Sequence, residues 1–443
     1  MSEVRNVKFR NAAAKVSAAS AAGAAPLPDN GTAASGGWEP ETWLGAPAPG
    51  GLALPPAHPS ASWLYAPRGA FLGTYRGREI LVAADTGNHR VMIWHSVPEK
   101  DETPCDVVLG QKDAESEGPD CGSGDTRRGM NLPTGVLVHD DLLIVGDAWN
   151  HRVLIYNGIP ESSGAEPDLV LGQESLDAVG PNRGADEIAA PNSFYWPFGI
   201  AVVNGRFYVA DTGNRRVLGW SGGIPSSPSV LPDVILGQPD GASREENRGG
   251  EPTASSFRWP HMLCGTDDTL LIADAGNHRV LGWTPHPDSD TDADLVLGQA
   301  AFDTAVENPY GPQSGDRYRF PYAADTDSGT GAAPGAGDGG SSGAARSAGP
   351  DAGPDAGPGP ARTRLAVADT ANNRILFWED MPTKEPRSPD AVLAQPAFTA
   401  NGENRWAGVA RDTLCWPYGI SLHGDRLAVA DSGNNRIMIW RRS

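Results

Sequence analysis

Six copies of a short polar motif place an arginine five residues after an aspartate. The first copy is Asp85-Thr86-Gly87-Asn88-His89-Arg90, and the six Asp and Arg positions are Asp85, Arg90, Asp147, Arg152, Asp211, Arg216, Asp274, Arg279, Asp369, Arg374, Asp431 and Arg436. A carboxylate beside a guanidinium could orient a reacting group, but a catalytic pair is rarely needed six times in one chain. We therefore interpret the pairs as structural. Between them, Gly and Asn are expected to supply the positive φ of a tight turn.

Chemically varied residues follow a proline that recurs once per copy. They are Arg68, Thr134, Phe198, His261, Tyr322 and Tyr418. These positions differ from copy to copy far more than the rest of the repeat, which makes them candidates for contact with a ligand or partner. Variable positions can also be merely unconstrained, and the sequence leaves both interpretations open.

Histidines are the residues best suited to metal binding, yet their positions do not form a ligand set. His89, His151 and His278 occupy one equivalent position of the motif, whereas His261 stands alone in its own set. A three-His or His-plus-carboxylate site cannot be assembled from equivalent positions. No Ser-His-Asp arrangement, phosphate loop or dinucleotide fingerprint is present. We assign no catalytic residue, no metal and no cofactor.

The elements that position these residues are short strands. Apolar runs flank each motif, as at 80–84 and 91–94, and a second signature, Asp-x-x-Leu-Gly-Gln, ends about 25 residues after the motif Asp. An apolar residue plus Pro, and then a further apolar run, comes next. Each unit thus holds four strands. Successive motif aspartates are 62, 64, 63, 95 and 62 residues apart, as expected for a repeat architecture.

The motif Asp-x-Gly-Asn-x-Arg, followed by a strand that ends in an aromatic residue, resembles the NHL repeat. The Leu-Gly-Gln strand is similar to bacterial members of that family, and the resemblance spans roughly residues 38 to 443. It implies an all-β fold, a six-bladed β-propeller of four-stranded antiparallel blades. In such a ring the first strand of each blade lines a central channel, and the varied residues after Pro mark its mouth.

Two ends and one insert complete the predicted organisation. Residues 1–37 are rich in Ala, Ser and Gly, and we expect a disordered tail before a propeller at 38–443. Residues 41–46 align with the fourth strand, which blade six lacks, so we predict that they complete that blade and close the ring. Residues 328–361, within blade five, form a low-complexity segment that we expect to be disordered and dispensable.

Composition limits the partners and the compartment. The formal charge is −20, and only five of the 35 basic residues are Lys, which argues against nucleic acid and anionic membranes. Four cysteines lack metal-ligand spacing and are expected to be free thiols. No apolar run is long enough for a membrane span, and the N-terminus is a poor signal peptide. We expect a cytoplasmic monomer, and export is the alternative if the start of the chain is misassigned. The 13 Trp recur at repeat positions, including 196, 259 and 416 before Pro, which predicts blade packing.

Function is expected on the face that carries the long interblade loops. These loops contribute Arg405 with Trp406, Tyr310, Tyr195, and Arg127 with Arg128. Aromatic and Arg side chains supply most interface hot spots, which favours a non-catalytic module that binds a protein or peptide. The alternative, which the resemblance implies, is a propeller enzyme of the lyase or lactonase type with a divalent metal in the channel.

Overall fold

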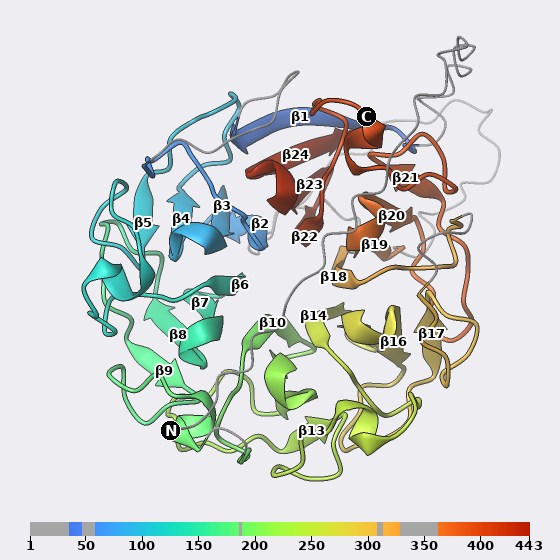
Figure 1. Ribbon diagram of the computed structural model, residues 1–443, viewed down its shortest axis with the longest axis horizontal. Helices are drawn as coiled ribbons and strands as arrows, with labels where there is room; N and C mark the ends of the chain where they lie inside the picture. Colours follow the sequence, from blue (N-terminus) through green and yellow to red (C-terminus); the bar gives the residue numbers. More distant parts are fainter. Residues whose placement is uncertain (1–34, 47–57, 186–187, 308–312, 328–361) are drawn as a thin grey trace, which may run out of the picture.

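The computed structural model describes residues 35–46, 58–185, 188–307, 313–327 and 362–443. Its strands form six four-stranded antiparallel sheets that stand as blades around a central axis (Figure 1). The prediction of an all-β, six-bladed propeller is therefore confirmed. The predicted insert at 328–361 and residues 1–34 of the predicted tail lie outside the described residues, whereas residues 35–37 form a turn before the first strand.

Five blades are each built from consecutive strands. Blade one holds β2 (Gly69–Tyr75), β3 (Arg78–Asp85), β4 (Arg90–Trp94) and β5 (Val107–Leu109). Blades two and three hold β6 (Pro133–His139), β7 (Leu142–Asp147), β8 (Arg152–Asn157), β9 (Leu169–Leu171), β10 (Pro197–Val203), β11 (Arg206–Asp211), β12 (Arg216–Trp220) and β13 (Val234–Leu236). Blades four and five hold β14 (Pro260–Gly265), β15 (Leu270–Asp274), β16 (Arg279–Trp283), β17 (Leu295–Leu297), β18 (Pro321–Asp327), β19 (Arg364–Asp369), β20 (Arg374–Trp378) and β21 (Ala391–Leu393).

Blade six joins the two ends of the propeller. It contains β22 (Pro417–His423), β23 (Arg426–Asp431), β24 (Arg436–Arg442) and, as its outer strand, β1 (Trp38–Gly45). β1 runs antiparallel to β24, from Trp38 opposite Arg442 to Gly45 opposite Arg436. Figure 1 shows β1 lying along β24 at the rim of the ring. The predicted closure by an N-terminal strand is present in the structure, and it pairs the edge of β24.

The first strands β2, β6, β10, β14, β18 and β22 surround the axis (Figure 1). All of these except β2 contain a register shift directly after the opening proline, as between Pro133 and Val136. Such a β-bulge re-aims the side chain that follows the proline. Five of the six varied residues after Pro, all except Arg68, are thereby set apart from the regular alternation of their strands.

The hydrophobic core is divided among the interfaces between adjacent blades. Between blades one and two, for example, Val82 and Val107 pack with Val136 and Val145. Trp94, Trp220, Trp283, Trp378 and Trp440, at the ends of the third strands, are all buried, as predicted. Repeated contacts of this kind make the ring a rigid support.

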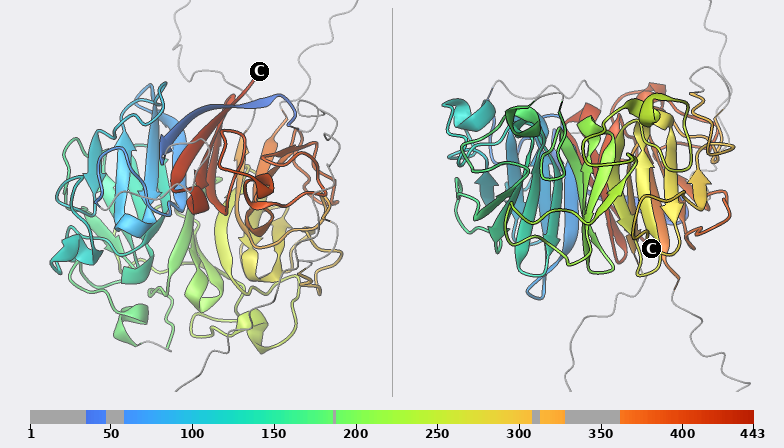
Figure 2. Two further views of the ribbon diagram at one scale, coloured as in Figure 1. Left: turned by 45° about the horizontal axis from the view of Figure 1, so that its top comes forward. Right: turned by 90° about the horizontal axis from the view of Figure 1, so that it is seen from below.

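Short 3-10 helices mark one face of the disc, which we call the loop face (Figure 2). One set forms the motif turns: η1 (Thr86–Asn88), η3 (Ala148–Asn150), η5 (Thr212–Asn214), η7 (Ala275–Asn277), η8 (Thr370–Asn372) and η10 (Ser432–Asn434). A second set lies in the interblade loops: η2 (Pro119–Gly122), η4 (Pro181–Gly184), η6 (Glu246–Gly249) and η9 (Glu403–Trp406). None of the helices in the described ranges has the length and apolar character that crossing a bilayer needs.

Candidate functional site

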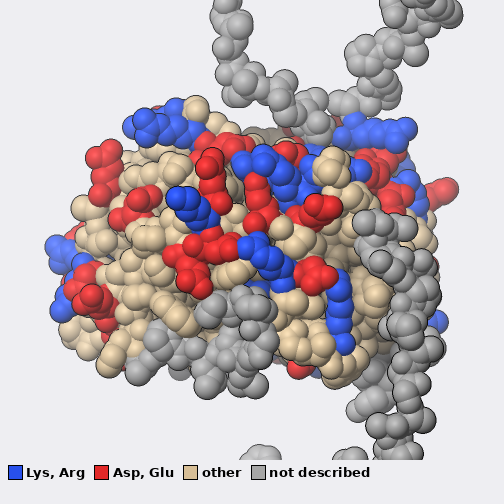
Figure 3. All heavy atoms as spheres, turned by 90° about the horizontal axis from the view of Figure 1, so that it is seen from above, with Lys and Arg blue, Asp and Glu red and all other residues tan. Residues whose placement is uncertain are grey.

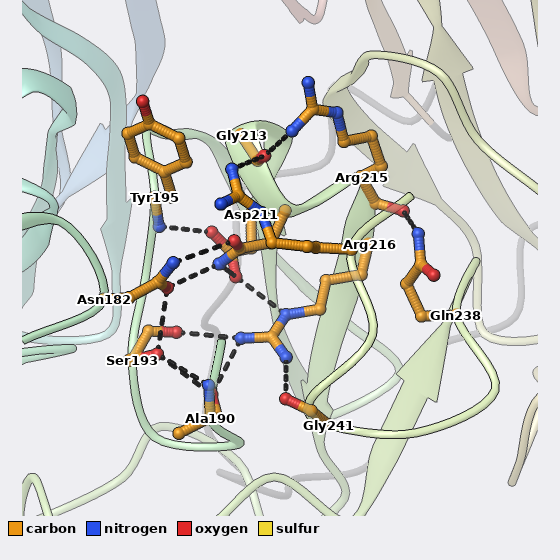
Figure 4. Close-up of polar contacts among 12 residues, drawn as sticks. Asn182, Ala190, Ser193, Tyr195, Asp211, Gly213, Arg215, Arg216, Gln238 and Gly241 are labelled. Carbon is orange, nitrogen blue, oxygen red and sulfur yellow. Dashed lines mark hydrogen bonds and ion pairs between the residues drawn. The ribbon is translucent and has the colours of Figure 1, made fainter. Parts of the chain in front are cut away.

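The Asp–Arg pairs lie at the base of the loop face, fully buried. In blade three, Asp211 accepts hydrogen bonds from the Tyr195 amide (2.7 Å), the Asn214 side chain (2.8 Å) and Arg216 Nε (2.8 Å) (Figure 4). All six pairs have Nε–Oδ2 distances of 2.7–3.0 Å and no solvent exposure. Burial raises the pKa of the Asp211 carboxyl, and the Arg216 guanidinium acts in the opposite direction.

Five of the six motif arginines, all except Arg436, also hold the loops on both sides of their blade, whereas among the described residues Arg436 donates only to carbonyls of the preceding loop. Arg216 donates to the carbonyls of Ala190 (2.8 Å) and Ser193 (3.0 Å) in the preceding loop (Figure 4). It donates as well to the carbonyl of Gly241 (2.6 Å) in the following loop. A single buried guanidinium thus fixes two interblade loops, and its repetition around the ring organises the loop face.

The prediction that Gly and Asn supply the positive φ of the turn is wrong. The left-handed residue is the fifth of the motif, with φ between 54° and 57° at His89, His151, Arg215, His278, Asn373 and Asn435. Gly213 is required for a different reason, because a Cβ there would lie 2.4 Å from the Tyr195 carbonyl oxygen. The turn is a 3-10 helix, and close backbone approach selects its glycine.

The fifth residue has a second task, which explains why it is usually His or Asn. His89 Nδ1 accepts a hydrogen bond of 3.2 Å from the Leu132 amide of the next blade. Equivalent bonds reach His151, His278, Asn373 and Asn435. Blade three carries Arg215 instead, and the corresponding Trp259 amide donates to Asp274 (3.2 Å). Arg215 therefore departs from the repeat in both residue type and role.

Asparagines in the interblade loops form a repeated contact that the sequence analysis missed. Asn182 exchanges side-chain hydrogen bonds with the motif residue Asn214, and Asn247 and Asn404 do so with Asn277 and Asn434, at 2.8–3.2 Å. The partners are 30–32 residues apart. An Asn-Arg dipeptide at this fixed distance before three motif copies is the signal that could have revealed it.

The residues predicted at the channel mouth do come together. We call Arg68, Thr134, Phe198, His261, Tyr322 and Tyr418 the mouth ring. Ring centroids lie 4.3 Å apart for Phe198 and His261, 4.4 Å for His261 and Tyr322, and 4.4 Å for the stacked Tyr322 and Tyr418. The Arg68 guanidinium lies 4.8 Å from the Tyr418 ring centroid. Thr134 turns away and donates to the Phe198 carbonyl (3.0 Å).

The mouth ring does not fit a divalent metal. Burial lowers the pKa of His261 to about 3, and the Arg68 guanidinium acts in the same direction. His261 Nδ1 lies 2.9 Å from the Trp259 carbonyl oxygen, so the neutral ring carries its proton there. One imidazole among aromatic rings and a guanidinium lacks the donor set of a metal site. Within the described ranges, no group of three or more His, Cys, Asp or Glu side chains could hold a metal ion.

Above the mouth ring lies a pocket of about 240 Å³, which we call the mouth pocket. Its walls combine mouth-ring residues with side chains from two motif turns and two residues before Pro: Arg68, Thr134, Ala148, Trp149, Trp196, Phe198, Thr212, Gly213, Arg215, Trp259, His261 and Tyr322. The prediction that the Trp residues before Pro pack the blades is wrong for Trp416, whereas Trp196 and Trp259 are partly buried and stack on neighbouring rings. Trp196 and Trp259 line the pocket, and Trp416 is exposed.

A polar groove of about 970 Å³ adjoins the pocket over blades three and four. The groove and the mouth pocket share Trp196 and Arg215. Charged side chains of both signs line the groove, among them Arg244, Glu246 and Arg258. Arg215 and Arg258 lie 3.4 Å and 3.3 Å from the carboxylate of Glu246.

The other candidate residues lie in the interblade loops. Arg405 donates to Asp412 and to the Ala394 carbonyl, all near its own loop, whereas Trp406 is 80% exposed. Neither is among the described residues that line the mouth pocket. Arg127 and Arg128 form ion pairs with Glu166. Tyr195 stacks on Trp196 with ring centroids 4.7 Å apart, and Tyr310 lies outside the described residues.

At the opposite end of the channel, a second cavity of about 450 Å³ is lined by two half-buried carboxyl groups, those of Asp325 and Asp327. Asp325 accepts hydrogen bonds from the amides of Leu422 in the next blade (2.7 Å) and Thr326 (2.9 Å). Burial raises its pKa to about 7, against the effect of these two amides. Through these bonds Asp325 links β18 to β22, the first strands of two adjacent blades.

All four cysteines are free thiols.

One comparison with known proteins, the match to a family model, agrees with this fold. Residues 194–220 match the NHL repeat. No curated protein matches the sequence. Similar solved structures include virginiamycin B lyase from Staphylococcus aureus (10% identity, TM-score 0.40, covering 86% of this chain and 96% of that one). An auxiliary nutrient binding protein from Bacteroides thetaiotaomicron is also similar (11% identity, TM-score 0.49, 91% and 75% covered).

Raptor from Chaetomium thermophilum is 12% identical, with a TM-score of 0.42; the likeness covers 92% of this chain but only 29% of Raptor. At these identities the likenesses concern the fold alone. The matched repeat lies in blade three, from the end of one interblade loop to the end of β12. The matched repeat and the six-bladed ring together fit the family of NHL-repeat β-propellers.

Proposed function

We propose that this chain is a non-catalytic propeller that binds a peptide or a segment of a protein on its loop face, in the cytoplasm. The ligand lies in the polar groove over blades three and four and reaches into the mouth pocket. The blades act as a rigid support and contribute no chemistry.

One observation carries this proposal: two departures from the repeated turn meet in the mouth pocket. Trp149 stands where the other copies have Gly or Ala, and Arg215 stands where they have His or Asn. Both line the pocket, although they come from different blades. Trp149 is 48% exposed, so burial in the core does not account for its size. The repeat does not require either residue, because the other copies have Gly or Ala, and His or Asn, at these positions. The two departures nevertheless line the same pocket.

The surroundings suit a peptide better than a free small molecule. Trp149 contacts Trp196, with ring centroids 5.4 Å apart, and Trp196 stacks on Tyr195. The pocket is smaller than the roughly 300–1,000 Å³ typical of small-molecule sites. Aromatic anchors in a small pocket beside a polar groove resemble the central hot spot and polar rim of protein interfaces. Loops fixed by buried arginines lose little entropy on binding.

The test is selection from a random library of peptides with free ends, followed by affinity measurement. Trp149→Ala is expected to weaken the selected peptides by about 2 kcal/mol, the usual loss at an aromatic hot spot. Leu231→Ala is the matched control, because Leu231 is an exposed apolar residue (54%) between β12 and β13, on the opposite face. Failure to select any peptide, or equal affinity of both variants, would contradict the proposal.

A further inference from the structure

The guanidinium of Arg68 is unusual among the arginines of this protein. Most described arginines form an ion pair or donate to carbonyls, whereas no side-chain hydrogen bond or ion pair of Arg68 occurs within the described residues, and its buried Nε has no partner there. Its contact is the ring of Tyr418, at 4.8 Å. A cation held against an aromatic ring without an anion is expected to bind one.

The mouth pocket contains no anion to neutralise Arg68. Its lining residues include no Asp or Glu, and its second guanidinium, Arg215, already lies near Glu246 (3.4 Å) and donates to the Gly213 carbonyl. His261 is held neutral by burial, so it adds no charge at neutral pH. With a formal charge of −20 on the whole chain, the protein repels polyanions. A single carboxylate that enters a neutral aromatic pocket is the ligand chemistry that remains.

The size of the pocket limits which part of a peptide can carry that carboxylate. About 240 Å³ holds roughly one large amino-acid residue. A carboxyl-terminal residue carries its carboxylate and an apolar side chain together, whereas an internal Asp or Glu needs a second residue to fill the aromatic wall. The groove meets the pocket at Trp196 and Arg215, so a chain lying in the groove can end there.

We propose that the mouth pocket binds the carboxyl-terminal residue of a peptide, with its carboxylate on Arg68 and an apolar or aromatic side chain against Trp149, Trp196 and Trp259. This inference rests on the proposed function, because it names the end of the peptide that the loop face binds. It also assigns Arg68 as the residue that determines specificity, and it predicts that an uncharged terminus is rejected.

The probes are three versions of one peptide, bound to the full chain and measured by calorimetry. The first ends in Phe with a free carboxylate, the second ends in Phe carboxamide, and the third is a carboxamide with Glu after Phe. The carboxamide is expected to bind at least about tenfold more weakly than the free acid, since a hydrogen bond to a charged group is lost. The Glu peptide is expected to bind as weakly as the carboxamide.

Arg68→Gln is expected to bind the acid and the carboxamide equally, whereas Arg76→Gln, a change of an exposed arginine in the β2–β3 turn, should keep the full difference. Arg68→Gln should not lower the melting temperature, because Arg68 has no carboxylate partner among the described residues. Equal binding of acid and carboxamide by the wild type, or tight binding of the Glu peptide, overturns the inference. If library peptides still bind and Trp149→Ala still weakens them, the proposed function survives that result; if no peptide binds, both fail.

Discussion

At the scale of single residues, this protein uses the same side-chain chemistry for two different purposes. Arginines in the motif are buried, paired with Asp and bonded to loop carbonyls, as Arg216 shows. Arg68, at the channel mouth, lies outside that network and has no hydrogen-bond partner for its Nε among the described residues. Burial and pairing therefore distinguish structural arginines from those available to a ligand, which residue type alone cannot do.

The buried pair in blade three should be costly to break from one side. Asp211→Asn leaves the Arg216 guanidinium without its counter-charge in a site with no solvent exposure. The expected loss is about 3–5 kcal/mol in the free energy of unfolding, measured by urea denaturation at pH 7. Asp141→Asn, which breaks the exposed pair with Arg76, is the matched control and should leave stability almost unchanged. Equal losses for the two variants would show that burial of the pair has no energetic consequence.

Asp325 makes stability depend on pH with a definite sign. Its folded-state pKa of about 7 exceeds the value of about 3.9 for an unfolded Asp, so the folded protein binds this proton more tightly. The stabilisation is full below about pH 4 and is lost as the pH rises to about 7. Asp325→Asn keeps an acceptor for the Leu422 amide and removes the titration.

Thermal or urea unfolding of wild type and Asp325→Asn from pH 4.5 to 8 checks this expectation. The stability of the variant relative to the wild type should rise with pH, by on the order of a few kcal/mol at pH 8. Asp141→Asn should follow the wild type throughout, because its carboxylate is exposed. Parallel curves for Asp325→Asn and wild type would mean that Asp325 ionises normally in the folded state.

At the scale of elements, β1 is the strand on which ring closure depends. Leu44 has no solvent exposure, faces Ile437 across the strand pair and packs with Leu64 and Ile439. Blade six would otherwise present the open edge of β24. The two ends of the propeller are therefore joined by hydrogen bonds and apolar packing between β1 and β24.

Leu44→Ala tests this closure without shortening the chain. Removing a buried Leu side chain is expected to lower the free energy of unfolding by about 2–5 kcal/mol. Leu231→Ala, at an exposed Leu outside the strands, should stay within about 0.5 kcal/mol of the wild type. If Leu44→Ala unfolds at the same denaturant concentration as Leu231→Ala, β1 does not contribute to the folded ring in solution.

The strands could be predicted from the sequence because six copies repeat the same pattern. The closure of the ring could be predicted because residues 41–46 are an additional copy of the fourth-strand signature. The mouth ring could be placed because each member follows the same proline. The turn conformation could not, since Gly213 is selected by its distance from the Tyr195 carbonyl, a contact between segments. The pocket could not either, because Trp149, Arg215 and Arg68 come from three blades and meet only in the closed ring. The sequence nevertheless shows that Trp149 and Arg215 differ from the residues at the same motif positions of the other copies.

At the scale of the whole molecule, charge and shape assign different roles to different surfaces. Along the rim over β1 and β24, acidic and basic side chains are interspersed (Figure 3), and several are paired, such as Arg441 with Glu41 (2.8 Å) and Arg426 with Glu79 (2.8 Å). Such exposed pairs favour solubility and contribute little to stability. The loop face instead combines aromatic rings, a groove and the guanidinium group of Arg68, which has no anionic partner among the described residues. The blades and the rim therefore support the fold, whereas the loop face is the surface that we propose binds the ligand.

The measurement that tests the central claim most directly is amide hydrogen exchange with and without a saturating peptide selected from the library. Added protection is expected on the loop face, at 148–149, 195–198, 245–252 and 259–261, which line the mouth pocket and the groove or adjoin them. The hairpin turns of the opposite face, at 76–77, 140–141 and 204–205, should exchange at unchanged rates. Protection confined to those turns, or to the rim over β1 and β24, would contradict recognition through the loop face.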